Sequence, residues 1–390
     1  MDISYWLALL SLLSLLATLF GCIEVTIGGL RLRALRDMAA LPDAELPRLS
    51  IVLSALDEAE TIVPALQSML ALDYPALEII VINDRSTDAT PQLLERLAAQ
   101  DARLKVLHVH ALPAGWLGKN HALHLGAARA AGDYLLFTDA DVVFHPQALR
   151  RAVSHCRRER LDHLTVFPDV VAPGGLLAML MLNFGINFML RFKPWKIRES
   201  SGHFLGMGAF NLVRAEAYRA AGGHAALRMQ VLDDLMLGKL MKRCGHAQDV
   251  LIGRGMLSIA WYRNAGQMFR GLEKNFFAGF DYRLSLLVAA TLLLGVRIWP
   301  WIGLLATDGV AWWMNAAGVA VLAAWFAGAA ITAGLTLRCL LYLPVVDVIS
   351  LAMLWRACLL TLRRGGIVWR GTFYPLAELR AAGTLSGRAD

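Results

Sequence analysis

The sequence predicts an α/β domain with a largely parallel sheet, with membrane helices before and after it. Between residues 48 and 280, short apolar segments rich in β-branched residues alternate with helical segments, which is typical of βαβ units. Long apolar runs lie on either side of this region, as expected of transmembrane helices. Of the 390 residues, 57% are hydrophobic, which exceeds what a soluble domain of this size usually carries.

The charge and the cysteines narrow the class of protein further. The net charge is +7, and in a membrane protein such an excess is expected of arginine and lysine near cytoplasmic lipid head groups. No basic run interleaved with aromatic residues indicates nucleic-acid binding, so we expect no nucleic-acid partner. The five cysteines are scattered without a Cys-x-x-Cys pair, which predicts a reducing compartment and no disulfide framework.

Residues 1–30 are predicted to form an N-terminal transmembrane helix. The apolar run over 6–27 is long enough, since a bilayer needs roughly 20 residues. A cleaved signal peptide is the alternative, but Asp2 gives the segment no basic start. Three arginines follow the run, at Arg31, Arg33 and Arg36. Positive charge on this side predicts that the chain continues in the cytoplasm, as a connector over 31–47 and then the α/β domain.

The first half of the α/β domain, which is predicted over residues 48–280, contains four expected strands. They are 49–54, 78–82, 105–109 and 134–138. Helical segments separate them: the first covers 60–72, the second follows residue 88 and ends at about 99, and the third covers 119–131. Because ligands of parallel α/β sheets bind beyond the carboxyl ends of the strands, we expect functional side chains there.

Acidic residues follow three of these strands. They are Asp57 and Glu58 after the first, Asp84 after the second, and Asp139 and Asp141 after the fourth. An Asp-x-Asp pair at a strand exit can bind one cation, and burying both charges without a cation would be costly. Because carboxylates supply oxygen ligands, we expect the cation to be Mg²⁺ or Mn²⁺, and we expect it to bind a diphosphate as well. A helix N-cap or an Asx turn is the alternative for single acids, and it fits Asp84 and Asp88.

Four motifs occur in order along the domain: SALDE at 54–58, VINDRSTD at 81–88, GKNHAL at 118–123 and TDAD at 138–141. Together they resemble family 2 glycosyltransferases of GT-A fold, a nucleotide-sugar-binding, Rossmann-like α/β fold. The resemblance covers roughly residues 48–275. The first motif departs from the family, which often has Pro and Asn where this chain has Ser54 and Asp57.

The resemblance implies roles for the residues of these motifs in binding a UDP-sugar. Asp57 and Glu58 would line the nucleoside pocket, and Asp84 would hydrogen-bond the uracil or the ribose. Asp139 and Asp141 would hold Mg²⁺ or Mn²⁺ on the diphosphate. Lys119 would place a positive charge near the sugar or the phosphates, and a solvated helix lysine is the alternative.

Two further segments resemble parts of the family. Asp233 and Asp234 precede a Leu-Gly helix as the family's acidic pair does, so Asp234 falls on the position of the catalytic base and Asp233 on that of the usual Glu. A neighbouring carboxylate would raise the pKa of the base, and acids at a helix N-terminus are the alternative. The glycine-rich segment 202–211 would pack beneath the donor sugar, with ordinary turn chemistry as the alternative.

The segment QMFRG at 267–271 resembles the Gln-x-x-Arg-Trp motif of lipid-glycosylating and processive members. Gly271 stands where those members have Trp, so this position does not support a stacking surface for the acceptor. Arg270 is expected to contact phosphate, and Gln267 to do so more weakly. The end of an amphipathic helix explains the same residues as well.

Residues 281–365 are predicted to return to the membrane, followed by a cytoplasmic tail over 366–390. The apolar runs 284–305 and 310–335 predict a helical hairpin, in which Arg297 is expected to snorkel or to pair with protein. The segment 339–362 favours a re-entrant or interfacial helix, because a span would carry the arginines that follow it outside.

The apolar segment 175–192 lies inside the predicted α/β range and carries two polar residues, Asn183 and Asn187, at helical spacing. We interpret it as a helix that lies in the membrane interface, because a transferase with a lipid acceptor would need such a surface. A transmembrane span and a core helix of the α/β domain are the alternatives.

The expected function is inverting transfer of a sugar from a UDP-sugar to the hydroxyl of a membrane lipid, by a multi-pass protein of the inner (plasma) membrane. The resemblance points to the bacterial branch similar to ceramide, hopanoid and carotenoid glucosyltransferases. The alternatives are transfer to polyprenyl phosphate, which needs no base, and a processive polysaccharide synthase, which needs more spans and an intact Gln-x-x-Arg-Trp. A non-catalytic membrane scaffold is a remote alternative, because the carboxylates that the chemistry requires are retained.

Overall fold

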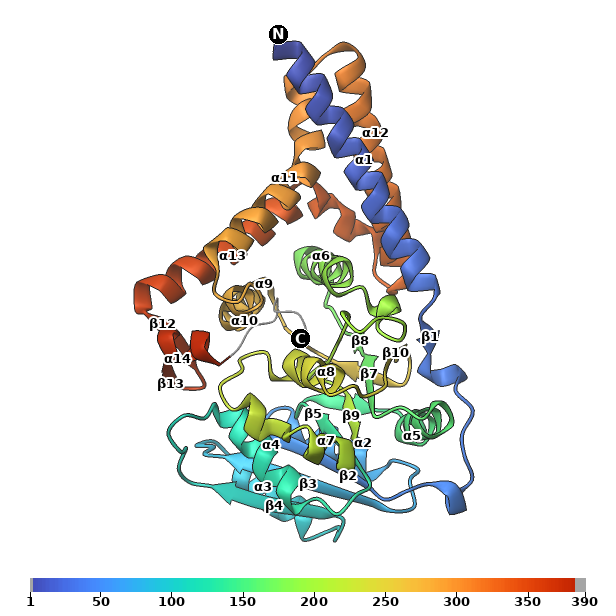
Figure 1. Ribbon diagram of the computed structural model, residues 1–390, viewed down its shortest axis with the longest axis vertical. Helices are drawn as coiled ribbons and strands as arrows, with labels where there is room; N and C mark the ends of the chain where they lie inside the picture. The colour runs from blue at the N-terminus through green and yellow to red at the C-terminus, as the bar shows by residue number, and fades with distance from the viewer. Residues whose placement is uncertain (1–2, 383–390) are drawn as a thin grey trace. The chain divides into compact units, whose positions relative to one another are not determined.

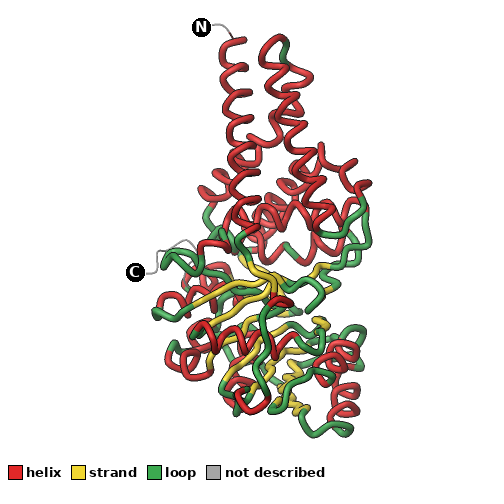
Figure 2. Tube along the Cα trace, turned by 90° about the vertical axis from the view of Figure 1, so that its right-hand side faces the viewer, coloured by secondary structure: helices red, strands yellow, loops and turns green. Residues whose placement is uncertain are grey.

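The computed structural model describes residues 3–382. Its contacts divide the chain into two units. The helical unit comprises Met1–Arg31, Ala172–Lys193 and Tyr262–Gly365, and the α/β unit comprises Leu32–Val171, Pro194–Trp261 and Gly366–Asp390. Figure 2 shows that strands are concentrated in the α/β unit and long helices in the helical unit.

The α/β unit is built on an eight-stranded sheet with the order β1-β10-β7-β9-β5-β2-β3-β4 (Figure 1). The strands are β1 (Arg33–Ala34), β2 (Leu49–Ala55), β3 (Leu77–Asp84), β4 (Leu104–Val109), β5 (Tyr134–Thr138), β7 (His163–Phe167), β9 (Asn211–Arg214) and β10 (Gln248–Ile252). Every neighbouring pair is parallel except the two that involve β9. The predicted, largely parallel sheet is therefore confirmed.

Helices and two small sheets complete the α/β unit. The helices are α2 (Ile62–Leu70), α3 (Thr90–Ala98), α4 (Gly118–Arg129), α5 (Ala148–Glu159), α7 (Ala215–Ala220), α8 (Asp233–Arg243) and α14 (Leu376–Ala381). One small sheet has the order β6 (Val142–Phe144), β11 (Leu257–Ile259) and β8 (Asp169–Val170), and the other pairs β12 (Gly366–Trp369) with β13 (Thr372–Pro375). The hairpin β12–β13 thus joins the α/β unit, although the apolar helices separate it from the rest in sequence.

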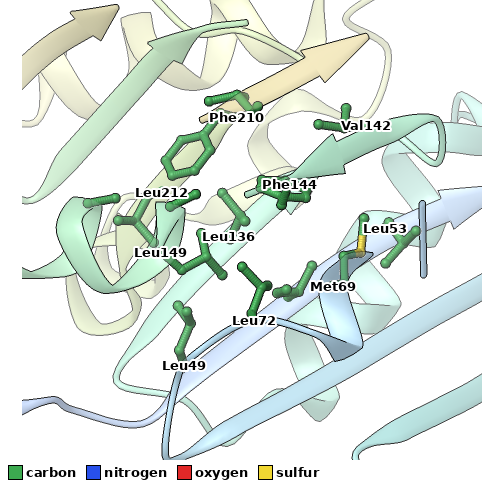
Figure 3. Close-up of a cluster of buried hydrophobic side chains, with 14 of the residues drawn as sticks. Leu49, Leu53, Met69, Leu72, Leu136, Val142, Phe144, Leu149, Phe210 and Leu212 are labelled. Atoms are coloured by element: carbon green, nitrogen blue, oxygen red, sulfur yellow. The ribbon is translucent and has the colours of Figure 1, made fainter. Parts of the chain in front are cut away.

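The core of the α/β unit lies against the central strands, as Figure 3 shows. All seven residues of β2 are buried, as expected of a strand covered on both faces. Leu53, Leu136 and Leu212, from three adjacent strands, have no exposed surface. Burial of each such side chain contributes about 1.5–3 kcal/mol. This packing fixes the strand ends from which the predicted site residues project.

The helical unit contains long apolar helices. Its helices are α1 (Ile3–Leu30), α6 (Gly175–Phe192), α9 (Ala265–Gly271), α10 (Glu273–Ala278), α11 (Leu284–Ala306), α12 (Gly309–Thr332) and α13 (Leu343–Arg364). Among residues 3–382, five helices are long and apolar enough to cross a membrane: α1, α6, α11, α12 and α13 with their immediate extensions. The predicted hairpin is confirmed as α11 and α12, and α1 runs beside α12 (Figure 1).

The polar residues of the helical unit meet one another inside it. Arg297 Nη1 donates to Asn187 Oδ1 at 3.0 Å and its Nη2 donates to Asn183 Oδ1 at 2.8 Å. The same guanidinium lies 3.2 Å from Asp347 Oδ2. Arg297 therefore pairs with protein, one of the two outcomes that we expected. Polar groups among apolar helices need such partners because hydrocarbon offers none.

This cluster explains the two polar residues of segment 175–192, and the predicted place of that segment in the membrane interface stays a prediction. We took Asn183 and Asn187 as polar interruptions typical of an interfacial helix, whereas they are the hydrogen-bond partners of Arg297. The alternative of a core helix in the α/β domain is wrong, because Ala172–Lys193 belongs to the helical unit. Residues 262–280, within the predicted α/β range 48–280, also group with the helical unit.

Candidate active site

The predicted site residues of the α/β unit gather beyond the carboxyl ends of its parallel strands, as expected for a doubly wound sheet. The acids follow β2, end β3 and follow β5: Asp57 and Glu58, Asp84, and Asp139 with Asp141. Two helices add their first turns, α4 with Lys119 and α8 with Asp233 and Asp234.

Lys119 joins two of the acidic groups. Its Nζ lies 2.9 Å from Asp139 Oδ1 and 3.3 Å from Asp233 Oδ2, and its side chain is 14% exposed. Burial by itself lowers the pKa of Lys119, but the carboxylates of Asp139, Asp233 and Asp234 together raise it well above its ordinary value. The alternative of a solvated helix lysine does not fit this position, because the ammonium group is a fixed positive charge among carboxylates.

Asp234 is held by backbone donors. Its Oδ2 accepts from the Gly208 N–H at 2.8 Å and its Oδ1 accepts from the Leu235 N–H at 2.8 Å. Burial, and after it the negative charge of Asp233, raises the pKa of Asp234 to about 6 against the opposing charge of Lys119. A carboxylate with a pKa near the working pH is suited to accept a proton, so the geometry agrees with a general base.

The backbone around Gly206 and Gly208 packs against two acidic residues of the site, Asp139 and Asp234. A Cβ at Gly208 would overlap Asp139 Oδ2, and one at Gly206 would overlap the backbone carbonyl of Asp234. Neither glycine has a positive φ. Turn chemistry therefore does not explain them, and close packing of the backbone against the acids does.

Asp139 and Asp141 form a donor set suited to a hard cation. Burial, and after it the negative charges of Asp139 and Glu58, raise the pKa of Asp141 to about 7. Within residues 3–382 no three His, Cys, Asp or Glu side chains are grouped as a metal site. A cation held here would need further oxygen ligands, and diphosphate and water supply these for Mg²⁺ in many proteins. The two aspartates fit such a shared site.

Asp57 connects two of the strand-end loops. Its Oδ1 accepts from the Thr87 N–H at 2.7 Å and from the Asp88 N–H at 3.2 Å. Its own N–H donates to Ser86 Oγ at 3.1 Å. Asp57 thus holds the loop after β2 against the loop after β3, while Asp88 accepts from the Thr90 N–H at 2.9 Å at the start of α3, as an Asx turn would.

Asp84 and Glu58 each face an arginine that the sequence interpretation missed. Arg85 Nε donates to Asp84 Oδ1 at 2.8 Å and Arg85 Nη2 donates to Asp84 Oδ2 at 3.1 Å, so both oxygens of Asp84 have a partner. Arg370 Nη2 lies 3.7 Å from Glu58 Oε1. Arg85 could have been noticed from its place inside the VINDRSTD motif, whereas Arg370 lies far in sequence from the four motifs of the α/β domain.

Gln267 and Arg270 belong to α9, which is part of the helical unit, so their predicted contact with phosphate stays a prediction. The Asn264 side chain accepts from the Gln267 N–H at 2.9 Å, and Gln267 Oε1 accepts from the Arg263 N–H at 2.9 Å, an arrangement similar to a capping box. Gln267 therefore stabilises the start of α9. A Cβ at Gly271 would lie 2.5 Å from the ring of Tyr262, so the position has no room for the family's Trp.

In the described part of the α/β unit, two of the hollows differ in character. A small cavity among the acids is lined by Lys119, Thr138, Gly208, His224, Asp233 and Asp234. A wider cleft of about 790 Å³ lies beside the amino ends of β5 and β7 and holds no predicted site residue. Two of its arginines already pair with acids, Arg48 with Asp133 at 3.2 Å and Arg214 with Asp162 at 2.7 Å. We therefore place the candidate active site at the small cavity.

The chain is similar in sequence to named glycosyltransferases. Two relatives are a 4,4'-diaponeurosporenoate glycosyltransferase of Staphylococcus haemolyticus and a beta-monoglucosyldiacylglycerol synthase of Synechocystis. The first is 27% identical over 59% of this chain and 61% of its own length. The second is 33% identical over 33% of this chain and 29% of its own length. The matches thus span less than two thirds of either relative.

A solved structure has the same fold. It is the mannosyltransferase PcManGT from Pyrobaculum calidifontis in complex with GDP-Man and Mn²⁺, which matches 91% of this chain and 98% of its own with a TM-score of 0.55. At 19% identity this likeness supports the fold alone, a GT-A-like α/β domain. The model of glycosyl transferase family 2 matches residues 50–222, which include three strand-end acidic groups, Lys119 and the glycine segment. The α/β unit of this chain therefore contains a glycosyl transferase family 2 domain.

Proposed function

We propose that this protein transfers a sugar from a UDP-sugar to the hydroxyl group of a membrane lipid, with inversion at the anomeric carbon. The observation that carries the proposal is the position of Asp234, whose pKa is raised to about 6 beside the cluster of Lys119, Asp139 and Asp233. The five candidate spans support a membrane acceptor, as do the two relatives named for a carotenoid acid and a diacylglycerol product. The arginines after α1 support a cytoplasmic α/β unit.

In the proposed reaction Asp234 removes the proton of the acceptor hydroxyl. The acceptor oxygen then attacks the anomeric carbon while the bond from that carbon to the diphosphate breaks. A single displacement of this kind inverts the configuration, and one base is sufficient for it. The Gly208 and Leu235 N–H groups keep the carboxylate of Asp234 in place during the proton transfer.

Lys119, Asp139 and Asp141 serve the leaving group in this proposal. Lys119 is a fixed positive charge 2.9 Å from Asp139 Oδ1, so it would stabilise negative charge on the departing diphosphate. Asp139 and Asp141 would hold a divalent cation, which would neutralise the charge of the nucleoside diphosphate. The Mn²⁺ in the complex of the structurally similar mannosyltransferase supports this expectation.

The test is release of nucleoside diphosphate by the full-length protein purified in detergent. A panel of UDP-sugars and GDP-Man is supplied with Mg²⁺ or Mn²⁺, with and without a lipid extract that contains hydroxylated lipids. We expect release from a UDP-sugar that requires both the cation and the lipid, and a glycolipid product. If GDP-Man is the only donor in the panel that gives release, the proposed UDP-sugar donor is refuted. If release requires polyprenyl phosphate, the proposed hydroxyl acceptor is refuted.

Gly208→Ala is expected to lower the rate of transfer at least about tenfold without unfolding the protein. The added Cβ would overlap Asp139 Oδ2 and push residue 208 away from Asp139. This shift would also disturb the hydrogen bond from the N–H of residue 208 to Asp234. Displacement of catalytic groups by about 1 Å can cost about 100-fold in rate. The measurement is the transfer rate together with the melting temperature. Gly202→Ala is the matched control in the same segment, because a Cβ there would meet only Ser200 Oγ at 3.8 Å. Equal rates for the two variants would contradict this prediction.

A further inference from the structure

The hairpin β12–β13 presents a single arginine at its turn. Trp369 pairs with Thr372, so Arg370 and Gly371 form a two-residue loop, and both have positive φ, 51° and 76°. Such a turn suits asparagine or glycine, and a residue with a long side chain is strained in the left-handed region. Arg370 is thus a residue that the turn itself does not favour.

The hairpin is anchored beside the site of the α/β unit. Ile367 and Tyr374, which pair across it, are both buried. The Gly118 N–H donates to the Tyr374 hydroxyl at 3.4 Å. Gly118 begins α4 and immediately precedes Lys119, so the hairpin rests on the turn that carries the lysine of the site.

At the tip of this anchored hairpin, Arg370 points to the loop after β2. Its Nη2 lies 3.7 Å from Glu58 Oε1 and its Nη1 lies 3.5 Å from Ser54 Oγ. Both distances exceed those of short hydrogen bonds, and 24% of the side chain is exposed. The guanidinium therefore keeps donors available for a ligand, since arginine has five N–H groups.

The surroundings of Arg370 point to an anionic ligand. Ser54 lies in β2, which pairs with β5 up to Thr138, and Asp139 and Asp141 follow β5 directly, so Arg370 stands at the edge of the predicted diphosphate site. A planar guanidinium can bind phosphate oxygens with two parallel hydrogen bonds, which a lysine ammonium cannot. A strained arginine at this edge is explained by such a ligand, whereas a purely structural turn would favour another residue.

We propose that the hairpin β12–β13 forms one wall of the donor site and that Arg370 binds the diphosphate group of the nucleoside diphosphate sugar. This inference rests on the proposed function. It makes Arg370 a binding residue for the donor, supplied by a segment that follows the last membrane helix in sequence.

The experiment compares UDP and uridine binding to the full-length protein in detergent with Mn²⁺, by calorimetry. The variants are Arg370→Asn and Arg370→Lys, with Arg96→Asn on the exposed surface of α3 as the matched control. For Arg370→Asn we expect UDP affinity to fall at least about tenfold, uridine affinity to stay unchanged, and the melting temperature to stay equal or rise, because asparagine suits the turn. Arg370→Lys should recover part of the UDP affinity through its charge.

The other outcomes overturn the inference. Unchanged UDP affinity in Arg370→Asn would show that Arg370 has no role in donor binding. If Arg370→Asn loses UDP and uridine affinity equally, or also melts at a lower temperature, Arg370 stabilises the structure of the α/β unit and does not contact the diphosphate. If the unsubstituted protein does not bind UDP, the proposed function itself fails and the inference falls with it.

Discussion

Asp234→Asn is expected to lower the rate of sugar transfer to a lipid hydroxyl by about 100- to 10,000-fold, which is the usual contribution of general acid–base catalysis. The substitution keeps the size of the side chain but removes the group that accepts the proton. UDP affinity serves as the control and should stay within about twofold, because the change spares the residues assigned to the nucleotide. The measurement is the initial rate of glycolipid formation at saturating donor. A variant with the rate of the unsubstituted protein would contradict a base at this position and would favour an acceptor that is already an anion, such as polyprenyl phosphate.

The pH dependence of the unsubstituted protein tests the same assignment. Burial and Asp233 raise the pKa of Asp234 to about 6, and a base works only in its ionised form. The rate should therefore level off above this pKa and fall about tenfold for each pH unit below it. In Asp234→Asn the residual rate should lose this dependence. A profile that falls only below pH about 4 would indicate a carboxylate with an ordinary pKa.

The strands and the strand-end acids could be predicted because their signals are local. A central parallel strand such as β2 is buried on both faces and is therefore a continuous apolar run, and the acids stand directly after such runs. The glycines at 206 and 208 were also visible, but their neighbours were not. Only the structure places Gly208 against Asp139 and Asp234, which come from distant parts of the sequence.

What could not be predicted depends on partners that are remote in sequence. Asn183 and Asn187 suggested a polar helix face because their partner Arg297 lies more than 100 residues away. The chain also enters the helical unit three times, so a continuous range of 48–280 could not describe the α/β unit. Arg370 follows the last long helix, and no local pattern connects it with Glu58.

Asp139→Asn combined with Asp141→Asn is expected to lower the transfer rate at least about 100-fold, because charge stabilisation by a metal ion contributes several kcal/mol and each 1.4 kcal/mol is tenfold. Mn²⁺ binding in the presence of UDP, measured by the spin-resonance signal of free Mn²⁺, should be lost with it. Asp133→Asn is the matched control, since Asp133 is an exposed acid at the amino end of β5, 3.2 Å from Arg48. If the double variant bound Mn²⁺ as tightly as the control, the assignment of these aspartates would be wrong.

The stability of the single variant Asp141→Asn should change in the opposite direction to its activity. Burial, with Asp139 and Glu58, raises the pKa of Asp141 to about 7, above the value of about 3.9 expected in the unfolded chain. The folded state therefore binds more protons than the unfolded state between these values, and stability is lost as the pH rises through them. Without metal ions, Asp141→Asn should melt at a higher temperature than the unsubstituted protein at pH 8 and show little difference at pH 4. A lower melting temperature at pH 8 would mean that the ionised Asp141 is already compensated within the protein, and then the argument that this pair needs a cation would fail.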